Sequence, residues 1–129
     1  MNTEFKIKVG GQTKDILRIT ELLAEQGVNL VTVSAEKIGE DVIVRLLTSD
    51  DERCTNALMK ADLEYEARPV LIAEVEDKPG QWASVARKLS EAGVEIEASY
   101  LLSRDGEKMK FVFAVNDPKK GAEIILRNT

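Results

Sequence analysis

The sequence lacks histidine altogether and contains a single cysteine, Cys54. Without histidine, the commonest general base and the usual nucleophile–base triads are missing, as are most zinc, copper and nickel sites. A lone cysteine excludes an internal disulfide and a cysteine-based metal cage. The sequence offers neither a histidine nor a second cysteine to activate the Cys54 thiol, so we expect Cys54 to be an unreactive residue of a helix. The sequence therefore predicts no metal, no cofactor and no enzymatic activity.

Long apolar runs and an excess of positive charge are missing as well. The longest apolar stretches have about five residues, such as residues 111–115, whereas a membrane-spanning helix needs about 20. The first residues show neither an apolar core nor a small-residue cleavage site, so no secretory signal is expected. The formal net charge of −5 argues against binding to nucleic-acid phosphates. We expect a cytoplasmic protein with neither a membrane nor a nucleic-acid partner.

What the sequence does contain is an internal repeat. A shift of 66 positions lays residues 5–30 over residues 71–96. Sequence identity is weak, but apolar positions and two glycines coincide. The coinciding pairs are Val9 with Val75, Ile16 with Trp82, Ile19 with Val85, Leu23 with Leu89, Gly27 with Gly93, Val28 with Val94 and Leu30 with Ile96. A shared pattern of this length predicts two copies of one backbone.

Each copy is expected to fold in the order β-α-β-β-α. Alternation of apolar and polar residues indicates the strands, and apolar spacing of i, i+3, i+7 gives the first helix of each copy one buried stripe. Gly27 and Gly93 fit the left-handed residue that ends a helix, and Asp50 and Asp117 fit the N-caps of the second helices. The expected strands are 5–9, 30–37 and 42–46 in the first copy and 70–75, 96–103 and 109–115 in the second.

A closing strand is expected in the first copy at about residues 63–67, and it runs into the second copy with almost no linker. No closing strand is visible in the second copy. We therefore predict an α+β fold of two ferredoxin-like βαββαβ repeats, residues 1–68 and 69–129, each an antiparallel sheet with helices on one face. Because an incomplete sheet edge invites pairing, we expect a homodimer.

The second copy contains the turn Asp77-Lys78-Pro79-Gly80, and Gly93-Val94-Glu95-Ile96 leads into its next strand. These two segments resemble those of the ACT domain, a small-molecule regulatory module of many enzymes of amino-acid metabolism. The family pattern is Asp/Asn-x-Pro-Gly, then Gly-Val/Ile-Asn-Ile/Leu. The first copy keeps Gly27-Val28-Asn29-Leu30 but has Gly11-Gln12-Thr13-Lys14 where the Pro-Gly turn belongs. The resemblance covers essentially the whole chain and implies two tandem ACT repeats that bind an amino acid.

The residues of this turn suit a zwitterion on their own chemistry. Pro79 fits a turn that leads into a helix, and Gly80 lets a ligand approach the backbone. The amides of Gln81 and Trp82 point out of a helix N-terminus that favours a carboxylate, and Asp77 can hold an ammonium group. The same four residues also make a good tight turn without any ligand, and the residues alone leave both interpretations open.

In side-by-side ACT pairs of the phosphoglycerate-dehydrogenase type, the resemblance implies a composite pocket. One module supplies the turn, and the other supplies a polar side chain at the start of its second strand. Cross-pairing gives a complete site with Asn29 and a second, degenerate site with Gly11 and Glu95, because Glu95 would repel a carboxylate. Pairing within one chain or between chains stays open. The predicted ligand-binding residues are Asp77, Lys78, Pro79, Gly80, Gln81, Trp82 and Asn29.

Two further interpretations were weighed. Phe111 and Phe113 resemble the aromatic strand of an RNA-recognition motif. They share one face of the expected strand with Met109 and Val115, however, which favours a buried stripe beneath helices. The negative net charge of the protein also disfavours RNA binding. Trp82 falls on the apolar helix stripe and is expected in the core, close to the turn. The sequence thus predicts a metabolite sensor that acts allosterically on a partner enzyme of amino-acid metabolism. The alternative is a ligand-free protein-interaction or dimerisation module.

Overall fold

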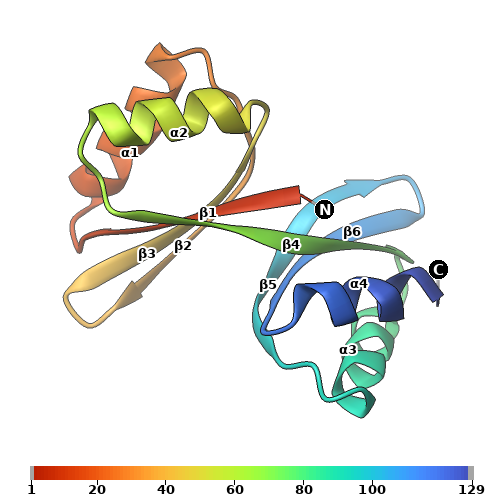
Figure 1. Ribbon diagram of the computed structural model, residues 1–129. Coiled ribbons are helices and arrows are strands. Elements are labelled where there is room, and N and C mark those ends of the chain that lie inside the picture. Colours follow the sequence, from red (N-terminus) through yellow and green to blue (C-terminus); the bar gives the residue numbers. More distant parts are fainter. Residues whose placement is uncertain (1, 128–129) are drawn as a thin grey trace. The chain divides into compact units, whose positions relative to one another are not determined.

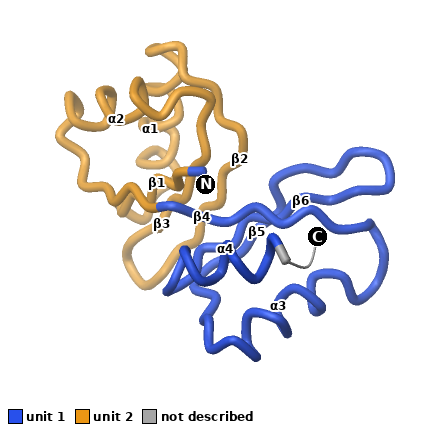
Figure 2. The backbone as a smooth tube through the Cα atoms, turned by 45° about the vertical axis from the view of Figure 1, so that its right-hand side comes forward, with its two compact units in different colours: residues 1–2, 69–129 blue, residues 3–68 orange. Residues whose placement is uncertain are grey.

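A single strand of 12 residues, β4 (Tyr65–Glu76), connects the two halves of the chain. The computed structural model describes residues 2–127, and the chain forms two units. The amino-terminal unit is residues 3–68, shown in orange in Figure 2, and the carboxy-terminal unit is residues 69–127 with residue 2, shown in blue. The beginning of β4 therefore belongs to the first of these units and the remainder to the second.

The amino-terminal unit is an antiparallel sheet in the order β2-β3-β1-β4, with two helices on one face (Figure 1). Phe5 lies opposite Leu46 in the pairing of β1 with β3. Both side chains face a core that also contains Ile19 and Leu23 from the first helix. The elements besides β4 are β1 (Asn2–Gly10), α1 (Thr13–Glu25), β2 (Leu30–Ile38), β3 (Asp41–Thr48) and α2 (Asp51–Lys60).

The carboxy-terminal unit repeats this plan with strands in the order β4-β6-β5. Its two helices also lie on one face of the sheet (Figure 1), and Phe113, Leu89 and Ile125 contribute to the core between them. Within the described residues, no strand follows the last helix of this unit. The elements besides β4 are α3 (Gln81–Glu91), β5 (Ile96–Asp105), β6 (Lys108–Val115) and α4 (Pro118–Arg127).

The α+β fold of two ferredoxin-like repeats is confirmed, and so are the local signals that predicted it. Gly27 and Gly93 have φ values of +73° and +76°, so both are left-handed residues just after a helix. The side chain of Asp50 accepts a hydrogen bond from the Arg53 amide at 3.0 Å, as an N-cap does. Asp117 accepts one from the Lys120 amide at 3.1 Å.

One detail of the fold differs from the expectation. The closing strand of the first copy begins at Tyr65 and not at Leu63, and as expected it runs directly into the first strand of the second copy. Leu63 instead packs against the core of the amino-terminal unit, and the Tyr65 ring lies 6.1 Å from that of Phe5. No helix in the described part of the chain is long and apolar enough to cross a membrane.

Replacement of Gly93 by valine should lower the free energy of unfolding by about 1–2 kcal/mol, because a β-branched residue is strained at positive φ. Crowding is not the reason, since an added Cβ would meet no atom of the described residues within 4 Å. Gly93→Asn is the matched control, because asparagine tolerates this backbone region. Equal denaturant midpoints for wild type and Gly93→Val would show that Gly93 is not a required left-handed cap.

Cys54 lies on α2 with its side chain buried in the core of the amino-terminal unit. Burial, with a smaller contribution from the charge of Asp51, raises the pKa of the Cys54 thiol to about 11 against a lowering hydrogen bond with Thr48. In the unfolded chain the thiol pKa is about 8.5. The folded state therefore binds the thiol proton more tightly, and the resulting stability is present below about pH 8.5 and lost as the pH rises through 11.

We predict that native Cys54 resists an aromatic disulfide reagent at pH 8 and reacts fully once the protein is unfolded in denaturant. The free energy of unfolding should fall more steeply between about pH 8.5 and 11 in the wild type than in Cys54→Ala. Rapid labelling of the native protein would contradict the buried, neutral thiol.

Candidate ligand-binding site

The turn between β4 and α3 leaves a helix N-terminus without a side-chain cap. Gly80 is the N-cap residue with a φ of +85°, and no side chain among the described residues caps this end. The first turn of α3 holds no acidic residue, so its positive dipole end is not neutralised locally. Gly80 is exposed, and an added Cβ there would meet no described atom within 4 Å. This end of α3 is thus open to an anion.

Asp77 fastens the same turn to the hairpin between β5 and β6. Its amide donates to the Glu107 carbonyl at 2.7 Å, and its Oδ2 lies 3.0 Å from Nε of Arg104. The Asp77 side chain is still 35% exposed. A ligand ammonium would therefore share this carboxylate with Arg104, a partner that the sequence did not reveal because it lies on a distant hairpin.

Lys78 turns back to β4. Its Nζ lies 2.8 Å from Oε2 of Glu76, and this hydrogen bond and charge, with help from Lys108, lower the pKa of the Glu76 carboxyl. The lysine charge is thus matched by a neighbouring carboxylate. Pro79 is exposed at the tip of the turn.

Trp82 is more exposed than the sequence indicated. The prediction that it lies in the core is wrong, because 40% of the residue is exposed. One face of its ring stacks on Phe113 with centroids 5.8 Å apart, and Nε1 donates to Oγ of Ser99 at 3.0 Å. Its place in the first turn of α3, with an N–H that needs a partner, explains why the indole covers the core without entering it.

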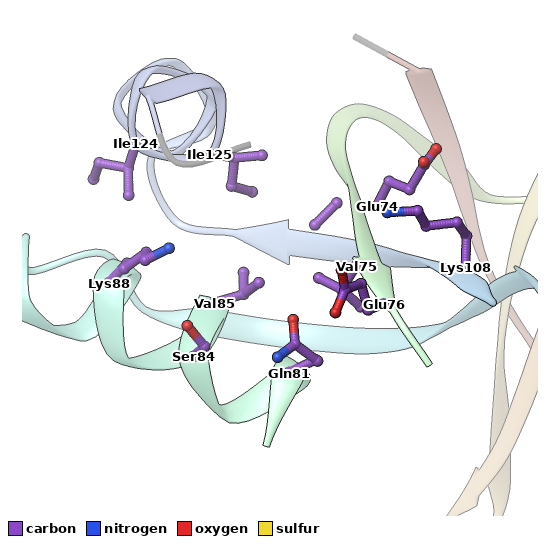
Figure 3. Close-up of a pocket in the computed structure, with 11 residues that line it drawn as sticks. Glu74, Val75, Glu76, Gln81, Ser84, Val85, Lys88, Lys108, Ile124 and Ile125 are labelled. Atoms are coloured by element: carbon purple, nitrogen blue, oxygen red, sulfur yellow. The ribbon is translucent and has the colours of Figure 1, made fainter. Parts of the chain in front are cut away.

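A groove lies between α3 and α4 over β4, next to the turn. It has a volume of about 650 Å³, and the side chain of Gln81 lies at one end of it. Figure 3 shows Gln81, Ser84 and Lys88 along α3, opposite Ile124 and Ile125 of α4. The sequence interpretation missed Ser84 and Lys88. Their spacing of i+3 and i+7 from Gln81 is the signal that places all three on one helix face.

The corresponding turn of the amino-terminal unit is closed. The backbone amide of Gln12, at the start of α1, donates to Oδ2 of Asp15 at 3.1 Å. The chain therefore supplies its own carboxylate to this helix end. A Cβ added at Gly11 would lie 2.5 Å from the Glu40 carbonyl oxygen. The turn therefore packs closely against the hairpin between β2 and β3 and has little room for a ligand.

Asn29 and Glu95 occupy equivalent places directly before β2 and β5. The backbone amide of Asn29 donates to Oγ of Ser49 at 3.0 Å, and the backbone amide of Glu95 donates to Oδ1 of Asn116 at 2.9 Å. Both residues are exposed. Asn29 and Gly11 belong to the amino-terminal unit, while Glu95 and the Asp77 turn belong to the other. Their predicted cross-pairing into one complete and one degenerate site therefore stays a prediction.

Comparison with known proteins identifies the fold. A structure of a protein from Bacteroides thetaiotaomicron superposes with a TM-score of 0.88 at 22% identity, covering 98% of this chain and 87% of the other. The regulatory subunit of aspartate kinase from Thermus thermophilus has a TM-score of 0.70 at 13% identity, over 98% and 91% of the two chains. That of Thermus flavus has a TM-score of 0.64 at 15% identity, over 98% and 94%. No curated protein matches significantly.

The model of the family described as the ACT domain pair matches residues 3–129. This match spans both copies of the repeat, and it agrees with two successive β-α-β-β-α units and with the glycine that follows the first helix of each. The chain belongs to the ACT domain pair family.

Proposed function

We propose that this ACT domain pair is a regulatory protein that binds an amino acid or a similar small zwitterion at the Asp77–Trp82 turn. The observation that carries the proposal is the unequal state of the two helix starts. α1 is capped by its own Asp15, whereas α3 begins at a glycine, without an acid in its first turn. The open end suits a ligand carboxylate.

The ligand would be held at both of its charges. Its carboxylate would accept hydrogen bonds from the backbone amides of Gln81 and Trp82. Its ammonium group would contact the exposed side of the Asp77 carboxylate. Trp82 would bound the site as a partly exposed ring fixed by Ser99 and Phe113. Asn29 is the proposed contribution of the other module, with pairing either within one chain or between chains.

The same reasoning gives one ligand for each chain. A pocket built from Gly11 and Glu95 would place a ligand beside a helix end already occupied by Asp15, and a Gly11 backbone packed against Glu40 supports a closed turn. Glu95 adds a negative charge where a carboxylate would have to lie. The second site is therefore proposed to be degenerate.

The partner is proposed to be an enzyme of amino-acid metabolism. Regulatory subunits of aspartate kinase from two Thermus species have this fold, which supports a role in passing a metabolite signal to a separate catalytic chain. The two repeats are assigned to residues 1–68 and 69–129, and the protein is proposed to be cytoplasmic and without catalytic activity of its own. No cluster of His, Cys, Asp or Glu in the described residues can hold a metal ion.

A thermal-shift screen of the twenty standard amino acids should find a stabilising ligand, and Asp77→Asn should weaken its binding by about 1.5–3 kcal/mol, as for a lost charge-assisted hydrogen bond. Because Trp82 is the sole tryptophan of the sequence and lies at the turn, its fluorescence can follow the titration.

Arg104→Gln is the matched control, because it removes the present partner of Asp77 without touching the proposed ligand contacts. Affinity should be kept or increased in this variant, and Glu95→Gln should have little effect. Absence of any thermal shift, or equal affinities of wild type and Asp77→Asn, would remove the proposed site and favour the interaction module.

A role in dimerisation has its own support. β2 is the outer strand of the amino-terminal unit, and its Val31 and Val33 are 51% and 46% exposed on one face. Alternating exposed valines on an outer strand suit pairing with a second copy of the chain. A homodimer is compatible with ligand binding and is proposed alongside it.

Light scattering at tens of micromolar, roughly the range in which weak interfaces dissociate, should give the mass of a dimer. Val33→Lys should shift the mass towards the monomer, because a lysine on an outer strand opposes pairing. Met59→Lys is the control, because it adds the same charge at an exposed position of α2 away from the outer strand. A wild-type monomer would contradict the proposal.

A further inference from the structure

The groove between α3 and α4, called the α3–α4 groove below, has an apolar centre. Val75 of β4, Val85 of α3, and Ile124 and Ile125 of α4 line this centre (Figure 3). Glu74 and Glu76 of β4 and Lys108 of β6 also line the groove. Gln81, Ser84 and Lys88 line the α3 side. The volume of about 650 Å³ is within the range of small-molecule sites.

The equivalent place in the amino-terminal unit is filled by the chain itself. The repeat shift of 66 positions brings Val75 onto Val9 and Val85 onto Ile19. These two residues line a depression of about 120 Å³, and Leu63 lines it as well. Leu63 packs against the core there as the chain leaves α2 for β4. The amino-terminal unit thus holds an aliphatic side chain at this place, whereas among the described residues of the carboxy-terminal unit no counterpart of Leu63 fills the groove.

The residues of α3 that line the groove differ in chemistry from their counterparts on α1. Leu22 packs against the amino-terminal core, and Lys88 is at the equivalent position of the other repeat. Ser84 is at the position equivalent to Arg18. In the described part of the chain, Lys88 makes no ion pair, while the groove's Glu76 and Glu74 are paired with Lys78 at 2.8 Å and Lys110 at 3.9 Å. A lysine that has no ion-pair partner among the described residues, and that lies beside apolar side chains, suits an anion that carries an aliphatic chain.

We propose that the α3–α4 groove binds an aliphatic monocarboxylate. The carboxylate lies at the Lys88 ammonium with the Ser84 hydroxyl as a second donor, and the aliphatic chain lies on Val75, Val85 and the two α4 isoleucines. From Lys88 to Gln81 the helix rises about 10 Å, which suits a medium-length chain.

This site is separate from the zwitterion site proposed at the turn. The turn uses the backbone amides at the start of α3 and the Asp77 carboxylate, whereas the groove uses side chains on the next two turns of α3. The two proposals can therefore fail independently, and Asp77→Asn should leave binding in the groove unchanged.

Calorimetric titration of the full chain with octanoate, and in parallel with uncharged octanamide, tests the groove. Octanoate should bind at one site for each chain and more tightly than octanamide. Lys88→Gln should weaken octanoate binding about tenfold or more, as for a lost charge-assisted hydrogen bond, and leave octanamide unaffected. Lys88→Arg should retain most of the affinity.

Lys119→Gln is the matched control, since it removes an exposed lysine of the same unit that does not line the groove. Its octanoate affinity should equal that of the wild type. Methyl resonances of Val85, Ile124 and Ile125 should shift on titration, and those of Val31 and Val33 should not. Absence of octanoate binding, equal affinities for octanoate and octanamide, or an unchanged affinity of Lys88→Gln would overturn the proposal.

Discussion

The sharing of one continuous strand, β4, between two copies of the same repeat is the constraint on which the differences between the copies depend. The strand closes the sheet of the amino-terminal unit and opens that of the carboxy-terminal unit. The approach to β4 brings Leu63 onto the core of the amino-terminal unit. Within the described residues, no strand follows α4 in the other unit, and no counterpart of Leu63 lines its groove.

The two repeats also differ at the start of their first helices, α1 and α3. Both repeats turn from a first strand into a first helix, and a helix start presents amides without intrahelical acceptors. At α1 the Asp15 carboxylate accepts a hydrogen bond from the backbone at the helix start, and Gly11 packs against the neighbouring hairpin. At α3 the turn is tied down from its other side, through the hydrogen bond from the Asp77 backbone amide to the Glu107 carbonyl, and its amides stay open. A rigid turn with open donors is preorganised for an anion.

Much of the fold could be predicted because its signals are local. The left-handed Gly27 and Gly93 and the capping Asp50 act on their own helix ends, so sequence spacing alone was sufficient to place them. The site depends on contacts between distant segments. The exposure of Trp82 follows from its partners Ser99 and Phe113, and these are set by strand register and cannot be obtained from helix periodicity.

The same limit applies to charged side chains. A turn that reads Asp-Lys-Pro-Gly indicates a helix start, but neither the pairing of Asp77 with Arg104 nor that of Lys78 with Glu76 follows from it. Helix spacing places Lys88 on one face with Gln81 and Ser84 but does not show that this face borders a groove. Its place beside a groove emerges when the corresponding Leu22 and the filling residue Leu63 are seen together in the other repeat.

The stoichiometry of amino-acid binding tests the central claim most directly. Calorimetry with the stabilising amino acid measures the number of sites for each chain without any variant, and so without any change to the fold. An open α3 end and a self-capped α1 end predict one molecule for each chain. Two equal sites for each chain, or no binding by any of the amino acids, would contradict the account.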